Sequence, residues 1–442
     1  MRKFINLALF TFIGSSCHNG GNASLTGHFE GYFEYRNKKL YTAITFESPN
    51  NKLGACISVP ANLLLNKPFT TVEYNAPVIQ LKMKDGDLPV NIVATLAKNN
   101  IDGKLDGNIP ASIHLTKVEN YIEPAKAYTI KEIILDNNGT KLLSNLYLPK
   151  KQFPSGAIIM VAGSGNHTKE EYNGAADLFA SRGIATLTFD KRNVTDAKGL
   201  HIKYVNADIT SMEDLVSDVE TAFNFLKTYK HIDRTKIGLM GFSLGAVEVP
   251  VVAARHPDIA FIVAVSGNAT TDSEFIINQG LNKYRGNNYD VETLKKAEDL
   301  YNDLFIYAKT RLNEEALQTK LNKAYLEKWG QLCFPPQVPN KDELKYLLSW
   351  NNFEFDPADY WKKINVPCLV VYGEKDNYIP VVRSLEILNK VFYSKKALLT
   401  LKVYANADHT IRTIPTKGEF SFPQYADGYI NNVMEWLLKQ TK

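Results

Sequence analysis

The chain has 442 residues, of which 45% are hydrophobic and 22% are charged. These proportions are ordinary for a globular protein, and the length alone suggests two or three domains. The formal net charge of +4 is small for this size, so it gives no case for a protein that binds nucleic acid. Four widely spaced cysteines without a CxxC pair favour neither a disulfide framework nor a zinc site.

The first sixteen residues, MRKFINLALFTFIGSS, have the composition of an export signal. Arg2 and Lys3 form a positive head, and a largely apolar stretch of ten residues follows from Phe4 to Ile13. A helix that spans a bilayer needs about 20 apolar residues. Residues 1–16 therefore predict a signal peptide rather than an anchor helix.

Cys17 follows this signal directly, and the stretch GSSC resembles the lipobox of bacterial lipoproteins. Gly14 departs from the usual box, which has a branched aliphatic residue there. The resemblance implies a lipid on Cys17, a membrane as partner, and a location in the bacterial periplasm or as an outer-membrane lipoprotein. Ordinary signal cleavage near Asn22–Ser24, which would give a secreted protein, is the alternative.

Residues 17–26 form a short polar linker, and residues 27–120 then have the pattern of a small all-β domain. Turn signals such as Asp85-Gly86 separate short segments rich in Val, Ile, Tyr and Thr. This pattern predicts an antiparallel barrel or sandwich. His28 and His114 are isolated within it, so we expect them to be structural. The segments are FEGYFEY, KLYTAITFES, PVIQLKMK, NIVATLAK and ASIHLTKVE.

Strands and helices alternate over residues 125–442. KEIILD and TKLLSNLYLP predict a leading antiparallel pair, and Ser211 begins a helix with a capping box to Asp214. Continuous apolar strands are expected where helices cover both faces of a parallel sheet. We therefore predict an α/β fold with a mostly parallel sheet flanked by helices. The strands are GAIIMVAGSG, GIATLTFDKR, KIGLMGFS, FIVAVSG, PCLVVYGEKD and LTLKVYANADH.

One long interval, residues 271–351, breaks this alternation with amphipathic, charge-rich sequence. About 80 residues are too many for an ordinary crossover. The interval predicts a helical cap over the end of the sheet. Its aromatic residues are core by default, although a few could line a substrate pocket.

The stretch GFSLG places Ser243 between Gly241 and Gly245, after an apolar strand and before a run of small residues. This G-x-S-x-G context is typical of a nucleophile elbow, a turn so tight that bulky neighbours two positions away would clash. The pattern predicts that the Ser243 hydroxyl stands above the carboxyl end of the sheet. An ordinary serine in a glycine-rich turn is the structural alternative.

A serine needs a base held by a third group, and in this context the chain order is serine, acid, histidine. Only two histidines follow Ser243, and His409 is the predicted base because it follows the last strand, whereas His256 follows the elbow helix. Asp376 is the favoured acid, with Glu374 as the alternative on the same loop. Asp408 is better interpreted as a neighbour that shapes the loop of the base.

The oxyanion of an acyl-transfer reaction needs two backbone N–H donors. Leu244 supplies one, because it follows the nucleophile at the start of a helix. Ser164, with Gly165 next, is the candidate for the other, from the loop after AIIMVAGSG. That loop could instead hold phosphate, but it lacks both the GxxxxGK[ST] pattern and the GxGxxG spacing.

These stretches resemble the α/β-hydrolase superfamily, and more narrowly bacterial carboxylesterases with an N-terminal β-domain. The resemblance implies that Ser243, Asp376 and His409 are the triad, with Ser164 in the oxyanion loop. The family usually has HGSGP or AGSGP followed by acidic and arginine residues, where this chain has GSGNHTKEEYNG. The resemblance is carried by residues 161–192, 237–246, 356–380 and 406–411.

The resemblance implies a serine carboxylic ester hydrolase that forms an acyl-enzyme on small or medium acyl esters and requires neither metal nor organic cofactor. A serine peptidase of the aminopeptidase type is the first alternative, because it shares the triad and differs only in its pocket. An inactive hydrolase body that serves as a surface binding module is the second.

Overall fold

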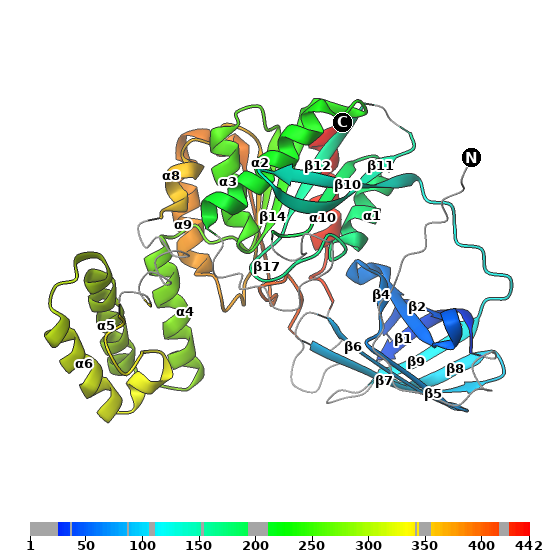
Figure 1. Cartoon of the computed structure of the whole chain (residues 1–442), viewed down its shortest axis with the longest axis horizontal. Coiled ribbons are helices and arrows are strands. Elements are labelled where there is room, and N and C mark those ends of the chain that lie inside the picture. Colours follow the sequence, from blue (N-terminus) through cyan, green and yellow to red (C-terminus); the bar gives the residue numbers. More distant parts are fainter. Residues whose placement is uncertain are drawn as a thin grey trace. The chain divides into compact units, whose positions relative to one another are not determined.

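The computed structural model divides the described part of the chain into two compact units, one ending at Glu123 and one beginning at Pro124 (Figure 1). The predicted signal peptide, Cys17 and most of the linker lie outside the described residues, as does the end of the predicted cap. In the described residues no helix is long and apolar enough to span a membrane. The described residues are 25–35, 38–85, 88–105, 111–151, 154–192, 211–340, 343, 355–414 and 424–442.

The described residues of the first unit form one antiparallel sheet of nine strands in the order β4-β3-β2-β1-β9-β8-β7-β6-β5, which confirms an all-β N-terminal region. The two edge strands, β4 and β5, are consecutive in the chain, with only two residues between Pro68 and Thr71. The sheet must therefore curl to bring its edges close, which favours the barrel over the two-sheet sandwich. The strands are β1 (Gly27–Tyr35), β2 (Lys38–Glu47), β3 (Gly54–Val59), β4 (Leu64–Pro68), β5 (Thr71–Asn75), β6 (Val78–Asp85), β7 (Leu88–Ala97), β8 (Asn100–Leu105) and β9 (Ala111–Lys117).

Side chains in this sheet alternate between its two faces, and those on one face form the core. In β9, Ala111, Ile113 and Leu115 are buried, whereas the residues between them are partly exposed. His28 bonds Thr45 through Nδ1 at 2.8 Å, and His114 lies 2.8 Å from Asp102. Both histidines thus have structural partners within the sheet.

The second unit is built on an eight-stranded sheet in the order β10-β11-β13-β12-β14-β15-β16-β17. Strand β11 pairs antiparallel with β10 and with β13, and all other pairs are parallel. Strands β12 and β16 are buried along their whole length, as a sheet covered on both faces requires. The strands are β10 (Tyr128–Asn137), β11 (Thr140–Pro149), β12 (Ser155–Val161), β13 (Ala185–Phe189), β14 (Ile232–Phe242), β15 (Phe261–Val265), β16 (Cys368–Gly373) and β17 (Leu399–Tyr404).

Helices cover this sheet as the sequence predicts. The predicted capping box of Ser211 and Asp214 begins α2, and the apolar face of this helix, from Leu215 to Leu226, is buried. Because the strands from β12 onward are parallel, the loops that follow β12, β14, β16 and β17 all lie at one edge of the sheet. The flanking helices are α1 (Asn173–Ser181), α2 (Met212–Thr228), α3 (Gly245–Arg255), α8 (Pro357–Trp361), α9 (Val381–Val391) and α10 (Tyr429–Thr441).

In the described part of the predicted cap interval, β15 is followed by α4 (Asp272–Gly286), α5 (Val291–Thr310) and α6 (Glu314–Leu326) (Figure 1). They pack around their own apolar cluster, which includes Tyr284 and Trp329. The Asn282 side-chain amide of α4 donates to the Asn377 carbonyl at 2.7 Å. This bond joins α4 to the loop after β16.

Candidate active site

Ser243 occupies a strained turn between β14 and α3. Its φ of 52° lies in the left-handed region, which non-glycine residues rarely adopt and which marks functional turns. Its backbone N–H donates to the Val265 carbonyl at 2.9 Å, and this bond fixes the turn against the neighbouring strand. The hydroxyl therefore stands at the carboxyl edge of the sheet.

Glycines on both sides make this turn sterically feasible. A Cβ at position 241 would lie 2.1 Å from the Gly245 carbonyl oxygen, and one at position 245 would lie 2.4 Å from the Val161 carbonyl oxygen. Both distances are far inside van der Waals contact, and the atoms that would be struck are backbone. The GFSLG spacing therefore has the steric cause expected of a nucleophile elbow.

His409 connects Ser243 with a carboxylate. Its Nε2 lies 2.9 Å from the Ser243 hydroxyl oxygen, and its Nδ1 lies 2.7 Å from Oδ2 of Asp376. The three groups come from the loops after β14, β16 and β17, which are more than a hundred residues apart at the extremes. The structure thus brings the three predicted site residues into one hydrogen-bonded chain.

Asp376 is the carboxylate that reaches the imidazole. Its side chain is 0% exposed, and its second oxygen accepts the backbone N–H groups of Tyr378 and Ile379 at 2.8 and 3.0 Å. These bonds compensate the burial of a charge. The carboxylate is thereby held in one orientation toward His409.

The alternative residues have other partners. Glu374 accepts the Asn406 backbone N–H at 2.9 Å, and this bond is the main cause that lowers the pKa of the carboxyl. Asp408 accepts the backbone N–H groups of Thr410 and Arg412, so it shapes the loop that carries His409. His256 lies 3.2 Å from Glu220 at the far end of α3.

The two segments that carry the predicted oxyanion donors both lie next to Ser243. Leu244 is the N-cap of α3, and across the described residues its N–H donates to no protein acceptor. Gly163 approaches from the loop after β12, since a Cβ built on it would lie 3.2 Å from the Ser243 Cβ. Ser164 follows it directly, so the structure places both predicted segments beside the serine.

The family profile described as the alpha/beta hydrolase fold matches residues 156–411, more than half of the chain. The chain belongs to the α/β-hydrolase family. This membership confirms the predicted fold class, and the matched range contains Ser243, Asp376 and His409.

Curated relatives of this hydrolase carry several names. Esterase EstD of Thermotoga maritima is 24% identical over 74% of this chain and 70% of its own length. Cutinase 2 of Thermobifida cellulosilytica is 24% identical over 46% of this chain and 70% of its own. An uncharacterized 31.7 kDa protein of Escherichia coli is 27% identical over 53% of this chain and 75% of its own.

Solved structures also align with the hydrolase. Est1E from Butyrivibrio proteoclasticus is 16% identical, with a TM-score of 0.41, over 70% of this chain and 98% of that one. The 2,6-dihydroxy-pseudo-oxynicotine hydrolase is 18% identical, with a TM-score of 0.42, over 70% of this chain and 67% of that one.

Three residues near the site were not identified from the sequence. Lys191 is only 7% exposed, and its Nζ donates to the Gly163 carbonyl at 2.6 Å. His167 lies with Nε2 2.6 Å from the Ser164 carbonyl. The exposed Tyr378 ring lies 5.1 Å from the His409 ring. Of the three, only Lys191 had a feature visible in the sequence, because it lies at the end of a predicted buried strand.

Glu248 of α3 is a buried acid behind the elbow. It is 2% exposed, and its Oε1 has no hydrogen-bond partner among the described residues. Burial raises the pKa of Glu248 to about 7, against the opposing effect of the Lys191 charge. The same burial lowers the pKa of Lys191. The Glu248 carboxyl and the Lys191 amine therefore both lie in a low-dielectric region near the site.

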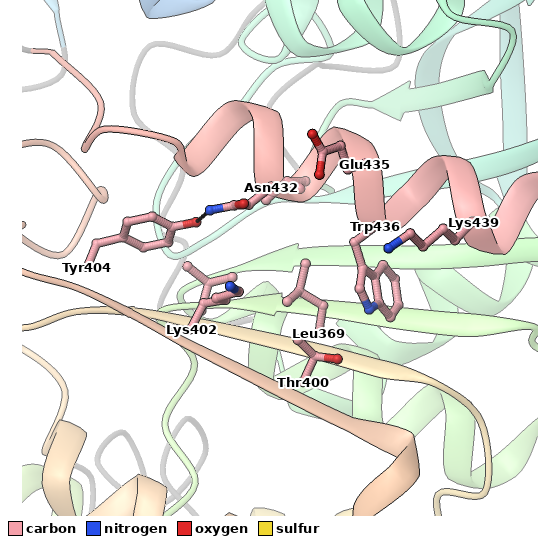
Figure 2. A pocket seen from close by; sticks show the side chains of 10 residues that line it. Leu369, Thr400, Lys402, Tyr404, Asn432, Glu435, Trp436 and Lys439 are labelled. Carbon is pink, nitrogen blue, oxygen red and sulfur yellow. Dashed lines mark hydrogen bonds between the residues drawn. The ribbon is translucent and has the colours of Figure 1, made fainter.

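A pocket of about 270 Å³ lies elsewhere on the second unit, between α10 and the last two strands (Figure 2). In it the Asn432 amide donates to the Tyr404 hydroxyl at 2.9 Å, and Trp436, Lys402 and Lys439 line the walls. None of Ser243, Asp376 and His409 lines this pocket. It is therefore separate from the candidate active site.

Proposed function

We propose that the protein is a serine ester hydrolase in which Ser243 is the nucleophile, His409 the general base and Asp376 the orienting acid. The observation that carries the proposal is the continuous path from hydroxyl to imidazole to carboxylate, with distances of 2.9 and 2.7 Å. Such a path activates a serine that would otherwise be a weak nucleophile.

In the first half of the reaction, the Ser243 oxygen attacks the ester carbonyl carbon, and its proton moves to His409 Nε2. The carbonyl oxygen becomes an oxyanion that accepts the N–H groups of Leu244 and Ser164. When the tetrahedral intermediate collapses, the carbon–oxygen bond to the alcohol breaks and His409 protonates the leaving alcohol. The acyl group remains on Ser243.

In the second half, water attacks the acyl carbon and its proton moves to His409. Collapse of this second intermediate releases a carboxylic acid and returns the proton to Ser243. Asp376 remains ionised throughout, because its role is to orient the imidazole through Nδ1–H and to stabilise the imidazolium.

Two supports favour esters as the substrate class. The relatives include proteins named as an esterase and as cutinases. The site also has the serine-dependent acyl-transfer groups in the chain order of α/β-hydrolases. We take small or medium acyl esters as the substrates, and we place the enzyme outside the cytoplasm, attached to a membrane through lipid on Cys17.

The test is a substrate panel on the purified protein. We expect hydrolysis of p-nitrophenyl acyl esters and no comparable turnover of aminoacyl-p-nitroanilides, which a peptidase would prefer. Ser243→Ala should abolish measurable ester turnover, whereas Ser112→Ala, which alters a hydroxyl of the N-terminal sheet, should leave turnover unchanged. Ester turnover by Ser243→Ala equal to that of the native protein would refute the proposal.

A further inference from the structure

Two consecutive carbonyl groups in the loop beside Ser243 are each held by a basic side chain. Lys191 Nζ donates to the Gly163 carbonyl at 2.6 Å. His167 Nε2 lies 2.6 Å from the Ser164 carbonyl. A carbonyl oxygen can only accept, so Nε2 of His167 carries the proton in this bond.

These contacts determine where the neighbouring N–H groups point. The Gly163 carbonyl and the Ser164 N–H belong to one peptide unit, as do the Ser164 carbonyl and the Gly165 N–H. Both units are trans, and in a trans peptide the C=O and N–H bonds point in opposite directions. Fixing each carbonyl oxygen therefore fixes the direction of the N–H group on the other side.

The two N–H groups fixed in this way are the candidates for the second oxyanion donor. Within the described part of the chain, neither the Ser164 nor the Gly165 N–H donates to a protein acceptor. Both remain available to a ligand, in a loop whose Gly163 lies next to the Ser243 side chain.

The basic groups are themselves anchored. The Lys191 backbone N–H donates to the His167 carbonyl at 3.0 Å, which joins the loop to the end of β13. Nearby, the Asp190 carboxylate accepts the Lys169 N–H at 2.8 Å. The other ring nitrogen of His167 lies 2.5 Å from a Glu171 carboxylate oxygen. This anchoring keeps the side chains in place independently of a substrate.

We propose that Lys191 and His167 are positioning residues that orient the peptide units of Gly163 and Ser164, so that the loop presents a preformed oxyanion donor. This inference rests on the proposed ester hydrolysis. Neither side chain contacts the substrate; each acts through the carbonyl oxygen that it binds. Preorganised donors act mainly on the transition state, so their misplacement lowers kcat more than it changes KM.

Lys191→Met tests the first contact, because methionine retains the apolar stem and removes the donor. We expect kcat on a p-nitrophenyl ester to fall roughly 10- to 100-fold, with KM changed by less than about threefold. Lys395→Met is the matched control. Lys395 also donates its Nζ to backbone carbonyls, including that of Lys362 at 2.9 Å, but it lies far from the loop in sequence, between α9 and β17. It should leave kcat unchanged.

His167→Ala and His167→Gln test the second contact. Alanine removes the donor, whereas the glutamine amide can still donate to the Ser164 carbonyl. We expect His167→Ala to lose about tenfold or more in kcat and His167→Gln to recover most of it. His256→Ala is the control, because it removes a histidine paired with a glutamate at the other end of α3.

A trifluoromethyl ketone separates positioning from general damage. Its carbonyl carbon accepts the Ser243 oxygen, its oxygen becomes an oxyanion, and the serine proton passes to His409. The inhibition constant should rise in Lys191→Met and His167→Ala by the same factor as kcat/KM falls. Unchanged kcat and inhibition in both variants, in a protein whose ester turnover requires Ser243, would overturn this inference alone. Turnover independent of Ser243 would instead refute the proposed function.

Discussion

The buried Asp376 carboxylate and the His409 imidazole are joined by a hydrogen bond of 2.7 Å between Oδ2 and Nδ1. The carboxylate is completely buried, whereas the imidazole is partly exposed and faces the serine. The acid thus has no access to bulk water, and its orientation depends on the backbone N–H groups after it. This geometry directs one carboxylate oxygen to the imidazole while the other is held by the loop backbone.

Asp376→Asn should therefore lower kcat by about 10³- to 10⁴-fold while the protein remains folded, since an amide does not stabilise the required tautomer or the imidazolium. Steady-state assays with p-nitrophenyl esters measure the fall in kcat. Glu374→Gln is the control, because Glu374 lies on the same loop but bonds Asn406. A larger loss in Glu374→Gln than in Asp376→Asn would reverse the assignment of the acid.

Gly241→Ala should destabilise the second unit and abolish turnover. The added methyl would lie 2.1 Å from the Gly245 carbonyl oxygen, and overpacking costs about 1 to 3 kcal/mol and occasionally more. Thermal unfolding measures the loss of stability, and a p-nitrophenyl ester assay measures the loss of turnover. Gly286→Ala is the matched control, because a Cβ there meets nothing within 4 Å. If Gly241→Ala behaves like Gly286→Ala, the steric account of the elbow is wrong.

Because of the buried Glu248 carboxyl, the free energy of unfolding should fall as pH rises. Burial raises its folded pKa to about 7 from 4.5, so its contribution is fully present below pH 4.5 and is lost as pH rises through about 7. A pKa shift of this size corresponds to about 3 kcal/mol in the free energy of unfolding. Urea unfolding at pH 5 and pH 8 measures the difference.

Glu248→Gln should remove part of this pH dependence of the free energy of unfolding. The remainder is expected from Asp272, whose pKa burial also raises to about 7, so Asp272→Asn serves as a parallel variant. An unchanged pH dependence of the free energy of unfolding in Glu248→Gln would show that this carboxyl is not protonated by burial.

Cys17→Ser should release the protein from membranes when the full chain is produced in a bacterial host. Cys17 directly follows the predicted export signal, and a lipid needs the thiol of that cysteine for attachment. Membrane fractionation and the mass of the mature N-terminal peptide measure the outcome. An unmodified N-terminus near Asn22–Ser24 in the native protein would favour ordinary cleavage and secretion instead.

The sequence predicted the fold and the residues of the candidate triad because these features have strong local patterns. Continuous apolar strands indicated the parallel sheet, and GFSLG indicated the turn at Ser243. The order of serine, acid and histidine, together with the positions of the last two predicted strands, then favoured Asp376 or Glu374 as the acid and His409 rather than His256 as the base. The choice between the two acids depends on where a loop turns, and the structure provides that geometry.

The contacts of Lys191 and His167 could not be predicted in this way. Both residues bind backbone carbonyl oxygens, and a carbonyl is present at every position, so the contact leaves no pattern in the sequence. Strands β4 and β5 are also weakly marked, because their side chains are partly exposed and lack a run of buried residues. Tertiary arrangement, rather than local propensity, defines these features.

Mass spectrometry of the purified protein after reaction with a fluorophosphonate tests the role of Ser243 most directly. An activated serine attacks phosphorus and displaces fluoride, so we predict one stoichiometric adduct on the peptide that contains Ser243, absent in Ser243→Ala and strongly slowed in His409→Ala. An adduct at another residue, or none on a protein that hydrolyses esters, would contradict the assignment of Ser243 as the nucleophile.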